Sequence, residues 1–129
     1  MQVVIRTDSS SKMGSGHLMR CLTLAEELRE EKNANILFIC RDLPGNLSNI
    51  VEDKGYQLKL LSYDENLQES LCDLSEHKQW LGASVDEDRD QSIEVIKNQG
   101  GVDLLVVDNY ALDEAWETPL RPHVDKIMV

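Results

Sequence analysis

The sequence predicts an α/β domain with a parallel β-sheet and helices on both of its faces. Short runs rich in valine, isoleucine and leucine recur along the chain, and stretches with helical spacing separate them. The length of 129 residues corresponds to one domain with a substantial core. Strands that alternate with helices in this way form parallel sheets through right-handed crossovers.

The first half of the chain starts with strand, loop and helix. Residues 3–5 form a β-branched run that is typical of a buried parallel strand. A helix is predicted to begin near Gly16 or His17, because apolar residues then recur at helical spacing. The next predicted elements are a buried strand at 36–40, a helix at 47–54 that stops at Gly55, and a strand at 57–61.

The second half repeats the alternation less regularly. Its predicted elements are a weak helical pattern at 64–74, an acidic helix at 86–99, the strongest apolar strand at 104–107, a helix at 113–120 interrupted by Pro119, and a strand at 126–129. The last strand has no covering helix after it, although a parallel sheet needs both faces covered. We therefore expect residues 1–129 to be the N-terminal domain of a two-domain protein whose C-terminal nucleotide-binding domain is missing here.

Composition and charge exclude several classes of protein. The chain is 41% hydrophobic and 29% charged, and it contains no apolar run near the ~20 residues of a membrane span. Its N-terminus has no signal-peptide pattern, so we expect a cytoplasmic protein without a membrane partner. A net charge of −11 argues against nucleic acid. Residues 1–41 nevertheless hold six Lys or Arg against five Asp or Glu, so an anion is expected to bind there.

The three cysteines do not form a recognisable site. Cys21, Cys40 and Cys72 are widely spaced in apolar surroundings, without the paired spacing of a zinc site or the density of a disulfide framework. We expect reduced core residues, with Cys21 close enough to the first loop to line a site.

The loop after the first strand is the predicted ligand site. Open α/β sheets bind ligands beyond the carboxyl ends of their strands, and a helix that begins there presents its free N–H groups to phosphate. Neither common nucleotide motif fits, because a dinucleotide fingerprint needs glycine where Met19 stands and a Walker A loop needs Gly-Lys-Ser/Thr. His17 and Arg20 are three residues apart, so they are expected on one helix face, toward one cleft.

The run Arg-x-Asp-Ser-Ser-x-x-x-Gly-x-Gly-His-x-x-Arg, from Arg6 to Arg20, resembles the N-terminal signature of one enzyme family. The family is the UDP-2,4-diacetamido-2,4,6-trideoxy-β-L-altropyranose hydrolases of pseudaminic acid biosynthesis, together with related spore-coat polysaccharide proteins. The similarity extends more loosely through Trp80-Leu81-Gly82 to Asp108-x-Tyr110. It implies a Rossmann-like sheet similar to the N-terminal domain of a glycosyltransferase B fold.

The resemblance also implies an activity. The family hydrolyses a UDP-linked 6-deoxy diacetamido sugar without metal or cofactor, and water attacks the anomeric carbon with inversion. His17 matches the catalytic histidine. The expected substrate-binding residues are Asp8, Ser9, Gly14, Ser15, Gly16, Arg20, Asp108, Asn109 and Tyr110. Most uridine and diphosphate contacts belong to the family's second domain, so residues 1–129 alone are expected to be inactive.

Several of these residues also have purely structural interpretations. Asp8 and the serines at 9–11 can cap the helix or turn the loop, and Arg20 can be a solvated helix residue. Arg6 is predicted to pair with Asp8 or Asp108 as part of the scaffold. The acidic run at 86–90 is predicted to start a helix and to form a solvated face.

Two other functions remain open at this point. UDP is a good leaving group, so a single base such as His17 suffices for inverting attack, and the attacking group can equally be a sugar hydroxyl. That alternative is an inverting glycosyltransferase. The second alternative is a non-catalytic sugar-binding module.

Overall fold

The computed structural model describes residues 1–11, 14–63, 84–109 and 112–129. The strands are β1 (Gln2–Thr7), β2 (Asn35–Arg41), β3 (Gln57–Leu61), β4 (Val102–Asp108) and β5 (Val124–Met128). The helices are α1 (Gly16–Lys32), α2 (Asn49–Asp53), α5 (Val85–Lys97) and α6 (Glu114–Glu117), and α6 continues as the 3-10 helix η1 (Thr118–His123). The predicted helix at 64–74 lies outside the described residues.

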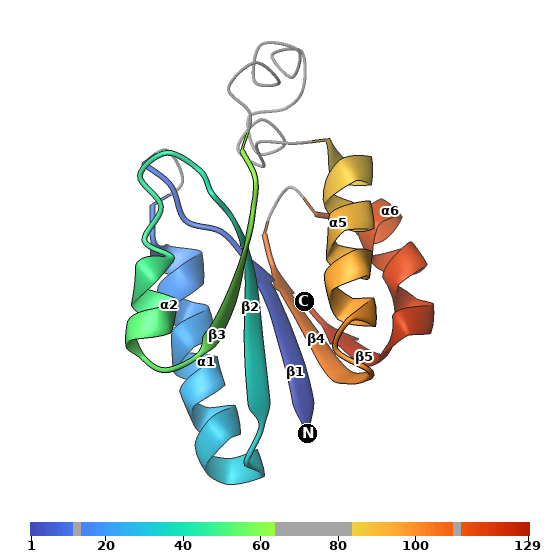
Figure 1. Ribbon diagram of the computed structural model, residues 1–129, viewed down its shortest axis with the longest axis horizontal. Helices are drawn as coiled ribbons and strands as arrows, with labels where there is room; N and C mark the ends of the chain where they lie inside the picture. The colour runs from blue at the N-terminus through green and yellow to red at the C-terminus, as the bar shows by residue number, and fades with distance from the viewer. Residues whose placement is uncertain (12–13, 64–83, 110–111) are drawn as a thin grey trace.

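The five strands form one parallel sheet in the order β3-β2-β1-β4-β5 (Figure 1). The chain moves outward from β1 through β2 to β3, and then returns to the other side of β1 to add β4 and β5. This is the Rossmann-like α/β arrangement, which confirms the predicted fold class. The order reverses between β1 and β4, so their carboxyl ends mark the switch point of the sheet.

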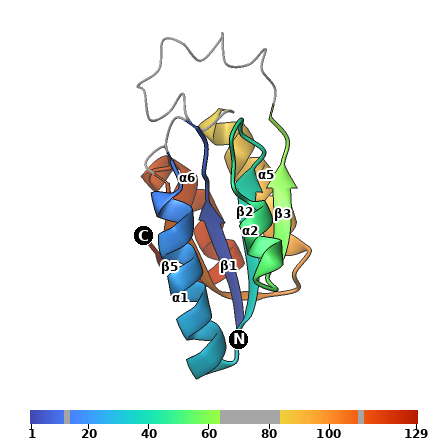
Figure 2. The ribbon, with the colours of Figure 1, turned by 90° about the vertical axis from the view of Figure 1, so that its left-hand side faces the viewer.

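Helices cover both faces of the sheet (Figure 2). The face that carries α1 and α2 buries alternate residues of β1 such as Val3 and Ile5, together with Phe38. The opposite face, covered by α5 and α6, buries Val4 and Trp116. Both faces of β1 are therefore apolar, and this explains why a central parallel strand has a continuous hydrophobic run.

The region predicted as a helix at 113–120 is helical, but only part of it is an α-helix. Only Glu114–Glu117 is α-helical, and a 3-10 helix with Pro119 and Pro122 follows it. A proline has no N–H to donate and crowds the preceding turn, so the tighter 3-10 turn replaces an α-helix there. The side chain of Asp113 caps α6 by accepting the N–H of Ala115 at 3.1 Å.

A cluster of four charged residues lies in the interior between the sheet and α5. Arg6, Asp8, Arg41 and Asp88, here called the buried ion cluster, are all at most 1% exposed. Arg6 donates to Asp8 at 2.6 Å and to Asp88 at 2.5 and 3.2 Å, and Arg41 donates to Asp88 at 2.7 Å. The pairing of Arg6 with Asp8 confirms one predicted alternative. The pairing with Asp108 was wrong, since Asp88 is the second partner.

The prediction of a solvated face at residues 86–90 was wrong for Asp88. This residue lies in the first turn of α5 but points into the protein, where the indole N–H of Trp116 donates to it at 3.0 Å. Its neighbour Asp86 remains at the surface with Arg89. A carboxylate can be buried here because two arginines neutralise its charge, and because they and an indole donate hydrogen bonds to it.

In the part of the chain that the structure describes, none of the helices combines the length and hydropathy that a membrane span requires.

Candidate active site

The candidate site lies where β1 and β4 end side by side, at the switch point of the sheet (Figure 1). Thr7 is the last residue of β1 and pairs with Asp108, the last residue of β4. The loop that follows β1 leads directly into α1, which begins at Gly16. Two loops and the start of a helix therefore meet at the edge where open α/β sheets bind ligands.

His17 is the second residue of α1, and its ring reaches across to β4. The Nδ1 atom lies 2.6 Å from Oδ1 of Asp108. A carboxylate only accepts hydrogen bonds, so Nδ1 is the donor in this contact. Nη2 of Arg20 lies 3.2 Å from the same nitrogen and donates to Asp108 instead. A ring with its proton on Nδ1 has its lone pair on Nε2. Asp108 thus orients the imidazole and selects the tautomer in which Nε2 can act as a base.

Arg20 lies one helical turn after His17 and binds the same carboxylate. Its Nε donates to Oδ2 of Asp108 at 2.9 Å, and its Nη2 donates to Oδ1 at 2.7 Å. His17 and Arg20 thus lie on one helix face, as predicted, and both contact the Asp108 carboxylate. That they face one cleft stays a prediction. The Arg20 side chain is 63% exposed while it makes this two-pronged contact.

These contacts keep Asp108 ionised. Burial by itself would raise the pKa of Asp108, but the hydrogen bonds from Arg20 and His17 and the charge of Arg20 outweigh it, so the pKa lies below its ordinary value of 3.8. The sequence placed Asp108 at the end of a central strand, but its pairing with His17, 91 residues away, follows only from the sheet order.

The predicted role of Cys21 and Cys40 as reduced core residues is confirmed, and Cys72 lies outside the described residues. Cys21 also borders the site, because its thiol lies 3.7 Å from Oδ2 of Asp108. Burial, with the nearby Asp108 charge, raises the pKa of Cys21 to about 12. Burial, with the charge of Asp8, does the same for Cys40.

Both described thiols are therefore expected to resist alkylation. Raising a thiol pKa from 9.0 to about 12 lowers the thiolate fraction at pH 8 about a thousandfold. Iodoacetamide labelling mapped by mass spectrometry should show Cys21 and Cys40 protected in the native protein and labelled rapidly in urea. Native labelling as fast as in urea would contradict the burial of these thiols.

The loop before α1 is held by its own backbone and by the segment after β2. Ser10 and Gly14 exchange backbone hydrogen bonds of 3.3 and 2.8 Å, and Gly14 has a φ of +77°. The Ser9 hydroxyl accepts the Leu47 N–H at 2.9 Å. Ser15 is the residue before the helix and makes no side-chain capping bond. Of the two structural roles considered for the serines at 9–11, the contacts of Ser9 and Ser10 fit the shaping of the loop. Gly16 leaves open space where a Cβ would lie.

Gly45 is expected to be indispensable for the shape of this loop. A Cβ at Gly45 would lie 2.8 Å from the Cβ of Ser11, and the φ of +76° is itself unfavourable for alanine. Gly45→Ala should lower the free energy of unfolding by about 2–3 kcal/mol. Gly14→Ala is the matched control, because Gly14 has nearly the same φ but no atom within 4 Å of the added Cβ. Urea denaturation should therefore show a smaller loss for Gly14→Ala, and equal losses would exclude the clash.

Asp8 and Asn109 lie beneath the His17, Arg20 and Asp108 side chains, and Asp8 is buried. Asp8 is fully buried and accepts the Arg41 backbone N–H at 2.7 Å as well as the Arg6 guanidinium. Its other oxygen accepts the Asn109 side-chain N–H at 2.8 Å. The predicted site residues thus converge at one edge of the sheet, some at its surface and some beneath it, whereas Tyr110 lies outside the described residues.

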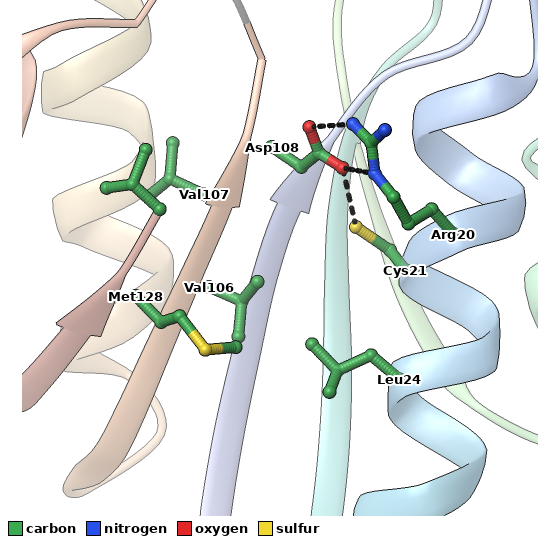
Figure 3. Close-up of a pocket in the computed structure, with 8 residues that line it drawn as sticks. Arg20, Cys21, Leu24, Val106, Val107, Asp108 and Met128 are labelled. Carbon is green, nitrogen blue, oxygen red and sulfur yellow. Dashed lines mark hydrogen bonds and ion pairs between the residues drawn. The ribbon is translucent and has the colours of Figure 1, made fainter.

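A cavity of about 300 Å³ opens beside Arg20 and Asp108, between α1 and the last two strands (Figure 3). Its polar end is formed by Arg20, Cys21 and Asp108, and its wall is apolar. The other residues that line it are Leu24, Val106, Val107, Met128 and Val129. The sequence indicated none of these wall residues as part of a site, because single apolar residues on separate elements have no distinguishing pattern.

Among the described residues, no group of three or more His, Cys, Asp or Glu side chains is placed to hold a metal ion.

Fold and site together define a Rossmann-like α/β domain with a His-Asp-Arg cluster at its ligand-binding edge. The chain is similar to the UDP-2,4-diacetamido-2,4,6-trideoxy-β-L-altropyranose hydrolase of Campylobacter jejuni, with 31% identity over 115 residues. The match takes in 84% of this chain but spans 37% of that relative's length. No protein-family model matches the chain.

Proposed function

We propose that this chain is the base-carrying domain of a nucleotide-sugar hydrolase that acts on a UDP-linked 6-deoxy diacetamido sugar. The observation that carries the proposal is the 2.6 Å contact between His17 Nδ1 and Asp108 at the switch point of the sheet. It leaves Nε2 as the basic nitrogen at the edge where such sheets bind their ligands. The similarity to the Campylobacter hydrolase supplies the substrate class.

In the proposed reaction His17 is the general base. Nε2 takes a proton from a water molecule as the water oxygen attacks the anomeric carbon of the sugar. A bond forms between that oxygen and the anomeric carbon, the bond from the anomeric carbon to the UDP oxygen breaks on the opposite side, and UDP leaves with the electron pair. The configuration inverts. Because UDP is a stable anion, its departure does not need a strong general acid.

The start of α1 is proposed to receive the diphosphate. The first backbone N–H groups of α1 have no acidic side chain in the first turn to compete with a bound anion. Gly14 and Gly16 flank Ser15 and let the ligand approach the backbone, since nothing lies within 4 Å of either Cβ position. We propose that a second α/β domain completes the site, in keeping with the 37% of the relative that this chain spans.

Replacing His17 tests the proposal directly. In the longer protein that this proposal expects, His17→Asn should reduce UDP release by about 10²–10⁴-fold, the usual contribution of a general base. His123→Asn is the matched control, since His123 lies in η1 at the opposite end of the described chain and should keep the parent rate. UDP release can be measured with a coupled assay. An unimpaired His17→Asn variant would overturn the assignment.

The nature of the attacking group can be tested in the same assay. Sugars with free hydroxyls, added as acceptors, should leave the rate of UDP release unchanged and yield no disaccharide. Acceptor-dependent release would identify a glycosyltransferase instead. Calorimetric binding of UDP-sugar without any turnover in the longer protein would identify a binding module.

A further inference from the structure

Side-chain hydrogen bonds link β1 and β4 at the end of the sheet and one residue beyond it. The backbone ladder between these strands ends at Thr7 and Asp108. There the Thr7 hydroxyl donates to the Asp108 carbonyl at 3.1 Å. The next residue of each strand is Asp8 and Asn109, and Asp8 Oδ2 accepts the Asn109 side-chain N–H at 2.8 Å. The two loops that carry the site are thus joined one residue beyond the sheet.

Asp8 is held firmly from behind. Its Oδ1 accepts the Arg6 guanidinium at 2.6 Å and the Arg41 backbone N–H at 2.7 Å, and its side chain is 0% exposed. Arg6 is in turn bound through two nitrogens to Asp88 of α5. Moving Asp8 would break the buried ion cluster, so the carboxylate is a rigid anchor for whatever it binds.

Asn109 connects the rigid Asp8 carboxylate to the candidate site. It directly follows Asp108, the residue on which His17 Nδ1 and the Arg20 guanidinium converge. We propose that Asp8 is a positioning residue: through Asn109 it fixes the start of the loop after β4 and so sets the position of the Asp108 carboxylate against His17. Asp8 then acts through protein donors rather than by the direct substrate contact predicted for it.

The expected effect of Asp8 on catalysis rests on the proposed function. Its expected effect on the hydrogen bond between His17 and Asp108 does not. If Asp8 and Asn109 position Asp108, disturbing their hydrogen bond loosens the bond between His17 Nδ1 and Asp108 even without substrate. A contact that only stabilised the fold would change the unfolding free energy and leave the His17 ring unaltered.

A swap of donor and acceptor tests the proposal. Asn109→Asp places a second carboxylate against Asp8, and Asp8→Asn removes the charge that faces Arg6. The double variant Asp8→Asn/Asn109→Asp keeps the net charge and restores one donor and one acceptor, with the hydrogen bond reversed. The side-chain carbonyl of the asparagine at position 8 can then accept the two hydrogen bonds that Asp8 Oδ1 accepts in the parent, from the Arg6 guanidinium and from the Arg41 N–H.

The first readout is the His17 ring in NMR spectra of the 129-residue chain without ligand. The parent should show a downfield Nδ1–H proton and the tautomer protonated at Nδ1. Asn109→Asp should lose this proton signal, because two carboxylates then face each other without a donor, and the double variant should regain it. Asp8→Asn should lose less of the signal, since the Asn109 amide can turn over and accept from the new asparagine. Asn109→Ala gives a milder disruption should a single variant not fold, and the native circular dichroism spectrum identifies folded variants. An unchanged His17 signal in folded Asn109→Ala, or a double variant no better than Asn109→Asp, would overturn the proposal.

The second readout is turnover by the longer protein. The single variants should lower kcat by roughly 10–100-fold, the range expected when a catalytic group is displaced by about 1 Å, with KM changed less than about threefold. The double variant should recover most of kcat. Rescue of the His17 signal in a protein whose parent releases no UDP would leave the positioning role established and overturn only the proposed hydrolase. A fall confined to KM would instead assign Asp8 or Asn109 to substrate contact and overturn the positioning role.

Discussion

Asp88→Asn is expected to lower the free energy of unfolding by about 3–5 kcal/mol, because it leaves the charges of Arg6 and Arg41 buried without their shared carboxylate. Asp88 is fully buried and accepts hydrogen bonds from both arginines and from Trp116. The whole stability of a domain of this size is about 5–15 kcal/mol. The variant should therefore be close to unfolding at 37 °C.

Urea denaturation followed by circular dichroism measures this effect. Asp86→Asn is the matched control, since Asp86 lies in the same helical turn but its side chain is 81% exposed, and it should change the unfolding free energy by less than about 0.5 kcal/mol. Trp116→Phe removes the indole donor and leaves a small cavity in the core, and it should fall between the two, at about 1.5–3 kcal/mol. A loss for Asp88→Asn no greater than that for Asp86→Asn would contradict the importance of the buried ion cluster.

The same residue gives stability a defined pH dependence. Burial alone would raise the pKa of Asp88, but the charges and hydrogen bonds of Arg6 and Arg41 hold it below its ordinary value of 3.8. The ionised carboxylate therefore contributes its full stability above about pH 3.8, and this contribution disappears as the pH falls through the lower folded-state pKa. Between pH 7 and pH 3 the parent should lose more stability than Asp88→Asn, which has no carboxyl group to protonate there.

Asp108→Asn is expected to reduce UDP release by about 10²–10⁴-fold with little change in stability. The amide group can still accept from Arg20, but its NH₂ can also donate to Nδ1 of His17. That arrangement favours the tautomer with its proton on Nε2, and such a ring cannot take a proton from water. The removed charge also no longer stabilises the imidazolium that forms during the reaction.

Asp103→Asn is the control for this variant. Asp103 lies near the beginning of the same strand, where it accepts the backbone N–H of Gln2 at 2.7 Å. It should retain the parent rate of UDP release. The NMR spectrum of Asp108→Asn should in addition show the His17 proton shifted from Nδ1 to Nε2. A parent-like rate in Asp108→Asn would exclude the orienting role of this carboxylate.

The strands β1, β2 and β4 were predictable because their apolar side chains are buried on both faces of the sheet. Residues 3–5, 36–40 and 104–107 are apolar without interruption, and each lies within a strand whose two faces are covered. The start of α1 was also predictable, since the apolar helical spacing begins at Leu18, just after the first residue of the observed helix, Gly16. Local patterns succeed for such elements because the signal is contained in neighbouring residues.

The prediction that Asp88 is exposed was wrong because the residues that decide its position are distant in the sequence. In the sequence it belongs to an acidic run before an amphipathic helix, which is the usual composition of an exposed first turn. Its partners Arg6 and Arg41 are 82 and 47 residues away. No local pattern distinguishes a carboxylate that meets two buried arginines from one that meets water.

Local sequence patterns were enough to predict the order of strands and helices, the place of the loop between β1 and α1, and the presence of His17 and Arg20 on one helix face. These depend on the spacing of neighbouring residues. The pairing of β4 with β1, which brings Asp108 to His17 and Asn109 to Asp8, was visible only in the folded structure. The same holds for the packing of α5, which brings Asp88 to Arg6. Side chains far apart in the sequence become partners here because the strand order places the elements that carry them side by side.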